Sequence, residues 1–405
     1  MIPEQLKAYD IRPEVVDMRE QIVQTRRDLH QNPELGFEEH RTAEMAAREL
    51  RALGLEVTEG VAKTGVVGLL RGARPGPTVL VRADMDALPM QEHNDVPYAS
   101  KNPHAMHACG HDGHVAMALA VARLLSARKN DIAGNVKLVF QPAEEGPGGA
   151  EPMIEAGVLE GPKVDVALGI HLWTPLAVGQ VGVTQGAFMA AADQFHLTIL
   201  GVGGHGAQPD RTIDPIVVSA HVVTALQSIV SRRSDPFDSV VVTVGSIHGG
   251  TANNIIPDRV VIEGTARALE PTVRERLEPA IHGLVRGVCD AFGARFDLQY
   301  IKGYPPTIND PDVTAMVAEC TRQAQGKPVI CRTMGGEDMS YFLDKVPGCF
   351  FFVGCGNEAK GFHHPHHSPF FDIDEDALLL GAEVMLRAID GALAGRHLAL
   401  AAGRG

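Results

Sequence analysis

Three short apolar segments constrain the fold of this chain more than any other feature. They are TVLVRA (78–83), VKLVFQ (136–141) and VDVALGIHL (164–172), which are rich in β-branched residues and apolar on both faces. Strands buried inside a largely parallel sheet have this pattern. A segment with alanine and leucine at helical spacing, Gly113–Arg128, lies between the first two. The alternation of strands and helices predicts an α/β fold.

The middle of the chain has a different order of elements. We expect strands and helices in the order β-α-β-β-α-β at 194–201, 213–231, 239–247, 259–268, 273–292 and 294–300. This is the ferredoxin-like order. Helix and strand then alternate again after Pro305, and 405 residues are enough for two or three domains. We therefore expect one domain of residues 1–185 and 303–405, interrupted by an inserted ferredoxin-like domain of residues 186–302.

Charge and cysteine usage argue against several classes of protein. The chain has 36 lysines and arginines against 50 aspartates and glutamates, a net charge of −14, which disfavours binding to nucleic acid or to anionic membranes. No apolar stretch approaches the roughly 20 residues that span a bilayer, and the first ten residues lack the apolar core of a secretory signal. The six cysteines include no CxxC pair. These features predict a cytoplasmic protein with reduced cysteines.

Carboxylate or imidazole side chains follow all three apolar segments. Asp84 and Asp86 follow the first, Glu144 and Glu145 follow the second, and His171 comes at the end of the third. Ligands of open α/β sheets bind beyond the carboxyl ends of the strands. Each pair alone is more often a solvated loop, but their shared position predicts one site at one edge of the sheet.

Two histidine-rich segments add candidate metal ligands to this edge. MHACGHDGH (106–114) contributes Cys109 and His111, and FHHPHHSPFF (362–371) contributes further imidazoles. A thiol alone is usually a small buried apolar group. Thiolate, imidazole and carboxylate together suit zinc, or manganese with less preference for sulfur. Five candidate ligands exceed one tetrahedral site, so we expect two metal ions about 3.5–4 Å apart. Of the adjacent Glu144 and Glu145, one can bind metal and the other can take a proton.

Eight motifs follow the opening segment RRDLHQNPELGFEEHRTA (26–43) in a fixed order along nearly the whole chain. They are RADMDALPM, HACGHDGH, QPAEEG, GIHLW, GVGGHGAQP, GGTANNIIPD, TMGGEDMSYF and HHSPFFDIDED. In this order they resemble the metal-dependent amidohydrolases that include hippurate hydrolase, indole-acetyl-amino-acid hydrolases, aminoacylases and related carboxypeptidases.

The resemblance implies roles in the first domain, which becomes the metal-binding catalytic domain. The implied ligands of two divalent ions, zinc or manganese with cobalt or nickel as further candidates, are Cys109, His111, Glu145, His171 and His367. Glu144 falls on the general base that activates water, and Asp86 on a carboxylate that orients the ligands. Asp84 replaces a ligand histidine of the wider superfamily, and we do not expect it to bind metal. His364 is the alternative to His367, which opens the H-S-P-x-F block.

The resemblance also implies that the inserted domain is a dimerisation or lid domain, so that the protein forms a homodimer or a higher homo-oligomer. In GVGGHGAQP, His205 falls on the residue that stabilises the oxyanion, either across the dimer interface or within one subunit. Asn254 and Arg267 fall on positions that bind the substrate carboxylate, for which the arginine fork is suited. Without the resemblance, His205 would be a loop histidine and Arg267 a partner in a surface ion pair.

The implied reaction is metal-dependent hydrolysis of the amide bond in N-acyl-L-amino acids, such as hippurate-like, acetyl or indole-acetyl conjugates. A dipeptidase or carboxypeptidase on the same scaffold remains open, as does a deacetylase of a diaminopimelate or cysteine derivative. A non-catalytic metal-binding protein is the alternative from another class. The presence of Glu144 beside Glu145 argues against it, because such a protein needs ligands but no base.

Overall fold

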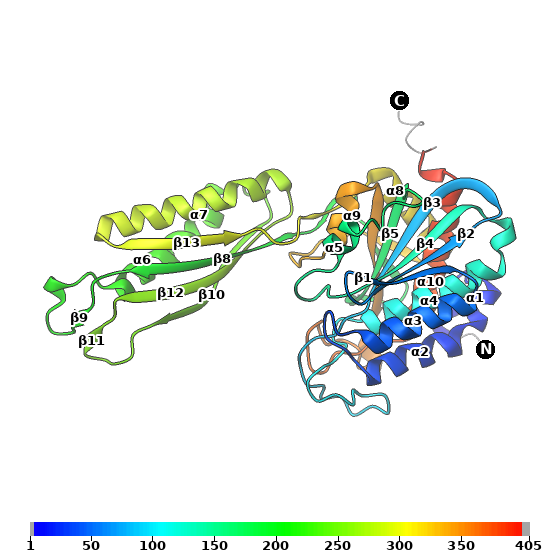
Figure 1. Cartoon of the computed structure of the whole chain (residues 1–405), viewed down its shortest axis with the longest axis horizontal. Helices are drawn as coiled ribbons and strands as arrows, with labels where there is room; N and C mark the ends of the chain where they lie inside the picture. The colour runs from blue at the N-terminus through cyan, green and yellow to red at the C-terminus, as the bar shows by residue number, and fades with distance from the viewer. Residues whose placement is uncertain (1–3, 399–405) are drawn as a thin grey trace. The chain divides into compact units, whose positions relative to one another are not determined.

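The computed structural model describes residues 4–398 and divides into two compact units (Figure 1). Of these residues, unit 1 contains 4–186, 308–331 and 341–398, and unit 2 contains 187–307 and 332–340. Residues 1–3 and 399–405 of the expected catalytic domain lie outside the described range. Unit 2 thus combines the middle of the chain with one later segment.

Unit 1 is built on a mixed eight-stranded sheet in the order β1-β2-β4-β3-β5-β16-β6-β15. The strands are β1 (Glu56–Val61), β2 (Gly65–Arg71), β3 (Arg74–Asp84), β4 (Ala133–Gln141), β5 (Val166–Ala177), β6 (Gln180–Gly182), β15 (Lys327–Val329) and β16 (Gly348–Gly356). The four central strands β4, β3, β5 and β16 are parallel. This confirms the predicted α/β fold with a largely parallel sheet.

The burial of the central strands explains why their sequences are apolar on both faces. All nine residues of β16 are buried, as are the last seven of β3. The search for short apolar runs does not predict β1 and β2. Strand β1 is largely exposed and carries charged residues, and β2 contains two glycines. These two strands extend the sheet on one side with antiparallel pairing.

The helices of unit 1 cover the sheet. They are α1 (Pro13–Asp17), α2 (Arg19–Gln31), α3 (His40–Ala52), α4 (His111–Ala127), α5 (Ala150–Glu155), α8 (Pro311–Gln323) and α10 (Ala377–Leu393), while α9 (Met339–Lys345) begins in unit 2. Helices α4 and α10 pack against each other and against β3 and β5. No helix among residues 4–398 combines the length and the apolar character needed to cross a membrane.

Unit 2 has the ferredoxin-like arrangement that its sequence pattern predicts (Figure 1). Its antiparallel sheet has the order β10-β12-β8-β13, from β8 (Ala191–Leu200), β10 (Val240–Gly249), β12 (Arg259–Ala268) and β13 (Arg295–Ile301). Helices α6 (Pro215–Ser228) and α7 (Pro271–Phe292) contact each other and the sheet. A short ribbon of β9 (Gly204–His205) and β11 (Ile255–Ile256) extends from it, and β7 (Gly186–Met189) and β14 (Thr307–Asn309) form a separate pair.

Candidate metal centre

The carboxyl edge of the parallel strands in unit 1 gathers the predicted ligands. Strand β3 ends at Asp84, and β4 ends at Gln141, just before Glu144 and Glu145. Strand β5 does not end at His171 as predicted, because its pairing with β16 extends it to Ala177. His171 nevertheless lies level with the end of β3, since Gly169 pairs with Arg82. Neighbouring strands therefore deliver these side chains to one place.

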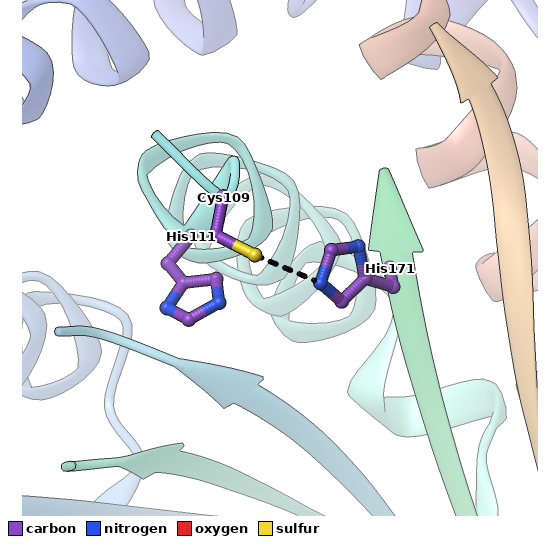
Figure 2. Close-up of side chains that lie close together, drawn as sticks. All are labelled: Cys109, His111 and His171. Atoms are coloured by element: carbon purple, nitrogen blue, oxygen red, sulfur yellow. Dashed lines mark hydrogen bonds between the residues drawn. The ribbon is translucent and has the colours of Figure 1, made fainter. Parts of the chain in front are cut away.

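Cys109 and His111 reach the same place from the start of α4. Gly110 between them has a φ of 95°, in the left-handed region that favours glycine, and it precedes the first residue of α4. Figure 2 shows the Cys109 thiol directed at His171 on β5, with Sγ 3.4 Å from Nε2. The His111 ring lies beside the thiol (Figure 2), with its centroid 5.9 Å from that of the His171 ring.

Overlapping groups of potential ligand atoms connect all five predicted ligands. Within each group, every ligand atom lies within 4.8 Å of the others, and the groups are Cys109–His111–His171, Cys109–Glu145–His367 and His111–Glu144–Glu145. His367 Nε2 lies 3.2 Å from Glu145 Oε1. His111 Nε2 lies 4.0 Å from a carboxylate oxygen of Glu144 and 4.0 Å from one of Glu145. The structure thus places the proposed base beside the proposed ligands.

Hydrogen bonds orient two of the imidazoles for metal binding. With the proton assigned to Nδ1, His111 donates to the Asp86 carbonyl oxygen at 2.9 Å and His171 to the Leu172 carbonyl oxygen at 2.6 Å. In both rings this arrangement leaves the Nε2 lone pair directed at the cluster. Among the described residues, the buried His111 Nε2 has no hydrogen-bond partner. An orphaned imidazole nitrogen among thiol and carboxylate groups fits a divalent cation.

The electrostatics of the cluster also favour a cation. Burial lowers the pKa of His111, but the carboxylates of Asp84 and Asp86 outweigh it and raise the pKa to about 10. Burial and the carboxylates of Glu145 and Glu144 raise the pKa of Cys109 well above its usual value. The site therefore attracts positive charge, and a bound cation would stabilise the Cys109 thiolate.

Arg82 and His114 both contact the carboxylate of Asp84. Arg82 Nη1 lies 2.5 Å from Asp84 Oδ2, and His114 Nδ1 lies 2.5 Å from Asp84 Oδ1. Asp84 Oδ2 is also 3.6 Å from His111 Nε2. His114 was not predicted as a site residue. Its signal was its position three residues after His111, which places both on one face of α4.

The four histidines of the segment 363–367 have different surroundings. His364 stacks on His363, with ring centroids 4.6 Å apart, and lies 5.5 Å from the ring of Phe370. His366 stacks on Trp173 at 4.5 Å and hydrogen-bonds through Nε2 to the Leu172 carbonyl oxygen. Of the four, His367 is the one whose ring nitrogen reaches the ligand groups.

Unit 2 brings His205 and Asn254 together but not Arg267. Gly206 N–H donates to the Asn254 carbonyl oxygen at 2.8 Å, and His205 pairs with Ile255. Arg267 lies toward the opposite end of β12, where it pairs with Ala192, whereas Arg259 pairs with Leu200 near the His205 ribbon. The eight residue steps from Arg259 to Arg267 correspond to about 26 Å along the strand.

Arg267 makes no salt bridge to a carboxylate among the described residues. Its side chain donates instead to the Met334 carbonyl oxygen at 3.4 Å and to Thr265 Oγ1 at 3.3 Å. The surface ion pair considered for Arg267 is therefore not formed in the described chain, and its charge remains available for an anionic group.

The chain is similar to known proteins along most of its length. Residues 80–391 match the model of peptidase family M20/M25/M40. The chain is 45% identical over 301 residues to an N-acyl-L-amino acid amidohydrolase of Geobacillus stearothermophilus, covering 74% of this chain and 81% of that protein. It is 44% identical over 380 residues to thermostable carboxypeptidase 2 of Saccharolobus solfataricus, covering 92% and 95%.

A solved structure of an M20 family protein is also similar to this chain. A Bacillus subtilis protein described as a dinuclear metal-binding peptidase of the M20 family superposes with a TM-score of 0.82 at 32% identity, covering 93% of this chain and 99% of that one. The predicted resemblance to metal-dependent amidohydrolases is confirmed. The chain belongs to peptidase family M20/M25/M40 and is a metal-dependent amidohydrolase or peptidase.

Proposed function

We propose that this enzyme hydrolyses the amide bond of N-acyl-L-amino acids, releasing a carboxylic acid and a free amino acid. The position of Glu144 is the main support for this reaction, because its carboxylate lies 4.0 Å from His111 Nε2 at the edge of the ligand cluster. The similarity to an N-acyl-L-amino acid amidohydrolase supports the choice of substrate class. A carboxypeptidase or dipeptidase is the second candidate, because a thermostable carboxypeptidase is similarly close.

We assign two divalent cations, zinc or manganese, to the five ligands Cys109, His111, Glu145, His171 and His367. When bound, such cations polarise a scissile carbonyl and acidify water. Glu144, which is 7% exposed, takes a proton from the attacking water and delivers it to the leaving amine. Asp86 supports both sides of the cluster, since its carbonyl accepts from His111 and its Oδ2 accepts from Glu145 N–H.

We assign the substrate contacts to unit 2. His205 donates to the oxyanion that forms on the former carbonyl oxygen, and Asn254 and Arg267 bind the amino acid carboxylate. About 26 Å along β12 separates Arg267 from the strand end near the His205 ribbon, which favours two different copies of unit 2 as the source of these residues. We therefore propose that a second copy of the chain supplies His205 and Asn254.

The exposed surface of unit 2 supports this homodimer. Strand β10 lies at the edge of its sheet, where backbone groups remain available for pairing, and its Ile247 is 49% exposed. Ile216 and Val217 on α6 are 45% and 46% exposed. A second copy can cover this edge and these apolar side chains.

Substitution of His367 and His364 tests the ligand assignment. His367→Ala is expected to lower the zinc bound per subunit after loading and dialysis, because it removes a donor next to Glu145. His364→Ala, the matched control, is expected to retain the wild-type amount, measured by elemental analysis. Retention of all zinc in His367→Ala with loss in His364→Ala would reverse the assignment.

Glu144→Ala tests the proton-transfer role. We expect the variant to retain wild-type metal content while kcat falls by about 10²–10⁴-fold, which is the contribution typical of general acid–base catalysis. Glu151→Ala, which removes an exposed carboxylate from α5, is the control and should keep wild-type kcat. Near-normal turnover of Glu144→Ala would refute the base assignment.

Co-expression of Glu144→Ala with His205→Ala subunits tests action across the interface. A mixed dimer would contain one site with both residues intact, so random pairing should restore about a quarter of wild-type activity. Pairing Glu144→Ala with the double variant should restore none. If the first mixture also stays inactive although mixed dimers are isolated, His205 acts within its own subunit.

A substrate panel tests the function itself. Metal-stripped enzyme is reloaded separately with zinc, manganese, cobalt or nickel and offered benzoyl, acetyl and indole-acetyl amino acids and several dipeptides. We expect metal-dependent release of free amino acid from the acyl conjugates, and about tenfold or more loss when the carboxylate is amidated, because the charge-assisted bond to Arg267 is lost. Preference for dipeptides would move the assignment to a peptidase.

A further inference from the structure

The turn that carries Glu144 and Glu145 begins with a strained residue. Ala143 has a φ of 55°, in the left-handed region where a side chain is disfavoured. Residues held in this region cost free energy and persist only where the surroundings impose them. The next two residues are the proposed base Glu144 and the proposed metal ligand Glu145. The orientation of their side chains therefore depends on the contacts that keep the Ala143 backbone in this conformation.

The buried carboxylate of Glu39 contacts this residue directly. Glu39 Oε1 accepts the Ala143 N–H at 2.8 Å and the Phe37 N–H at 3.0 Å, while Oε2 accepts the Thr64 hydroxyl. Glu39 is 0% exposed, and no cation among the described residues forms a salt bridge with it. Its oxygens accept hydrogen bonds from backbone and hydroxyl donors. These bonds offset the free-energy cost of burying the carboxylate.

A second carboxylate holds the other end of the turn. Asp86 Oδ2 accepts the Glu145 N–H at 2.9 Å, so the backbone on both sides of Glu144 is bound by a buried acid. Asp86 also receives the His111 ring N–H through its carbonyl oxygen. Glu39 differs from Asp86 because, among the described residues, no hydrogen bond or salt bridge joins it to a proposed ligand, and its link to the turn is the bond to Ala143 N–H.

The segment before Glu39 packs against the same residue. A Cβ built on Gly36 would lie 3.1 Å from both Cα and Cβ of Ala143, and 3.7 Å from Asp86 Oδ2. The chain from Gly36 to Glu39 therefore fits closely against the turn by its backbone as well as by its carboxylate. The hydrogen bond between Ala143 and Glu39 joins residues that are 104 apart in the sequence.

We propose that Glu39 is a positioning residue that holds Ala143 in the left-handed conformation and thereby directs Glu144 toward the reacting water and Glu145 toward the metal ions. The inference rests on the proposed function for the role of Glu144. For Glu145 it requires only that this side chain binds metal, so the two parts are separable by experiment.

The test measures kcat and zinc affinity in parallel. Glu39→Ala is expected to weaken zinc binding, followed by titration calorimetry on stripped protein, by about 10–100-fold, as loss of a partner that orients a ligand typically does. It should also lower kcat more than it raises KM. Glu39→Gln keeps an acceptor for Ala143 N–H and should remain near wild type. Glu38→Ala, which removes the exposed neighbouring carboxylate, is the matched control and should change neither quantity.

The decisive variant adds Ala143→Gly to Glu39→Ala. Glycine adopts a φ of 55° without steric cost, so the double variant should recover much of the lost zinc affinity and kcat. If Glu39 only stabilises the fold, glycine at position 143 will not restore either quantity. Failure of this rescue, or wild-type values in Glu39→Ala itself, would overturn the proposal.

Two further results separate possible failures. If the wild-type enzyme fails to hydrolyse N-acyl amino acids while zinc affinity still falls and recovers as described, the proposed substrate is wrong and the positioning of Glu145 stands. If Glu39→Ala does not fold, Gly36→Ala displaces Ala143 while leaving Glu39 in place. Its zinc affinity should fall, and an unchanged affinity would overturn the proposal.

Discussion

Buried carboxylates gather at one edge of the parallel sheet in unit 1, and buried negative charge needs positive charge beside it. The topology of β3, β4 and β5 brings Asp84, Asp86, Glu144 and Glu145 to the same edge, where all but the half-buried Glu145 are buried and repulsion between the carboxylates is costly. Arg82 contacts the Asp84 carboxylate, yet Asp84 and Asp86 together still raise the pKa of His111. A pair of divalent cations is the compensation that fits the donor atoms present.

The same requirement explains a buried ionic network outside the cluster. Arg26 of α2 is fully buried and lies 2.8 Å from carboxylate oxygens of both Asp112 and Asp372. Asp112 follows His111 on α4, and Asp372 lies in the segment that follows His367. The guanidinium thus links the two segments that carry the proposed ligands His111 and His367, and removing one partner would leave a charge uncompensated.

Elements with a local apolar pattern could be predicted from the sequence. Features that depend on pairing between remote segments could not. Apolar runs located β3, β4 and β5, and the residues that follow them lie in the candidate metal cluster. The length of β5 was not predictable, because β16 is remote in sequence, and His171 lies inside the strand as a result. The separation of Arg267 from His205 follows from strand register, which motifs do not contain. Glu39 gave no signal, since its partner Ala143 is distant in the chain.

Diffraction from zinc-loaded crystals, recorded on both sides of the zinc absorption edge, tests the two-metal assignment most directly. Two anomalous peaks per subunit, about 3.5–4 Å apart, are predicted among Cys109, His111, Glu145, His171 and His367. A single peak, or a peak held by Asp84 and His114 instead, would contradict the assignment.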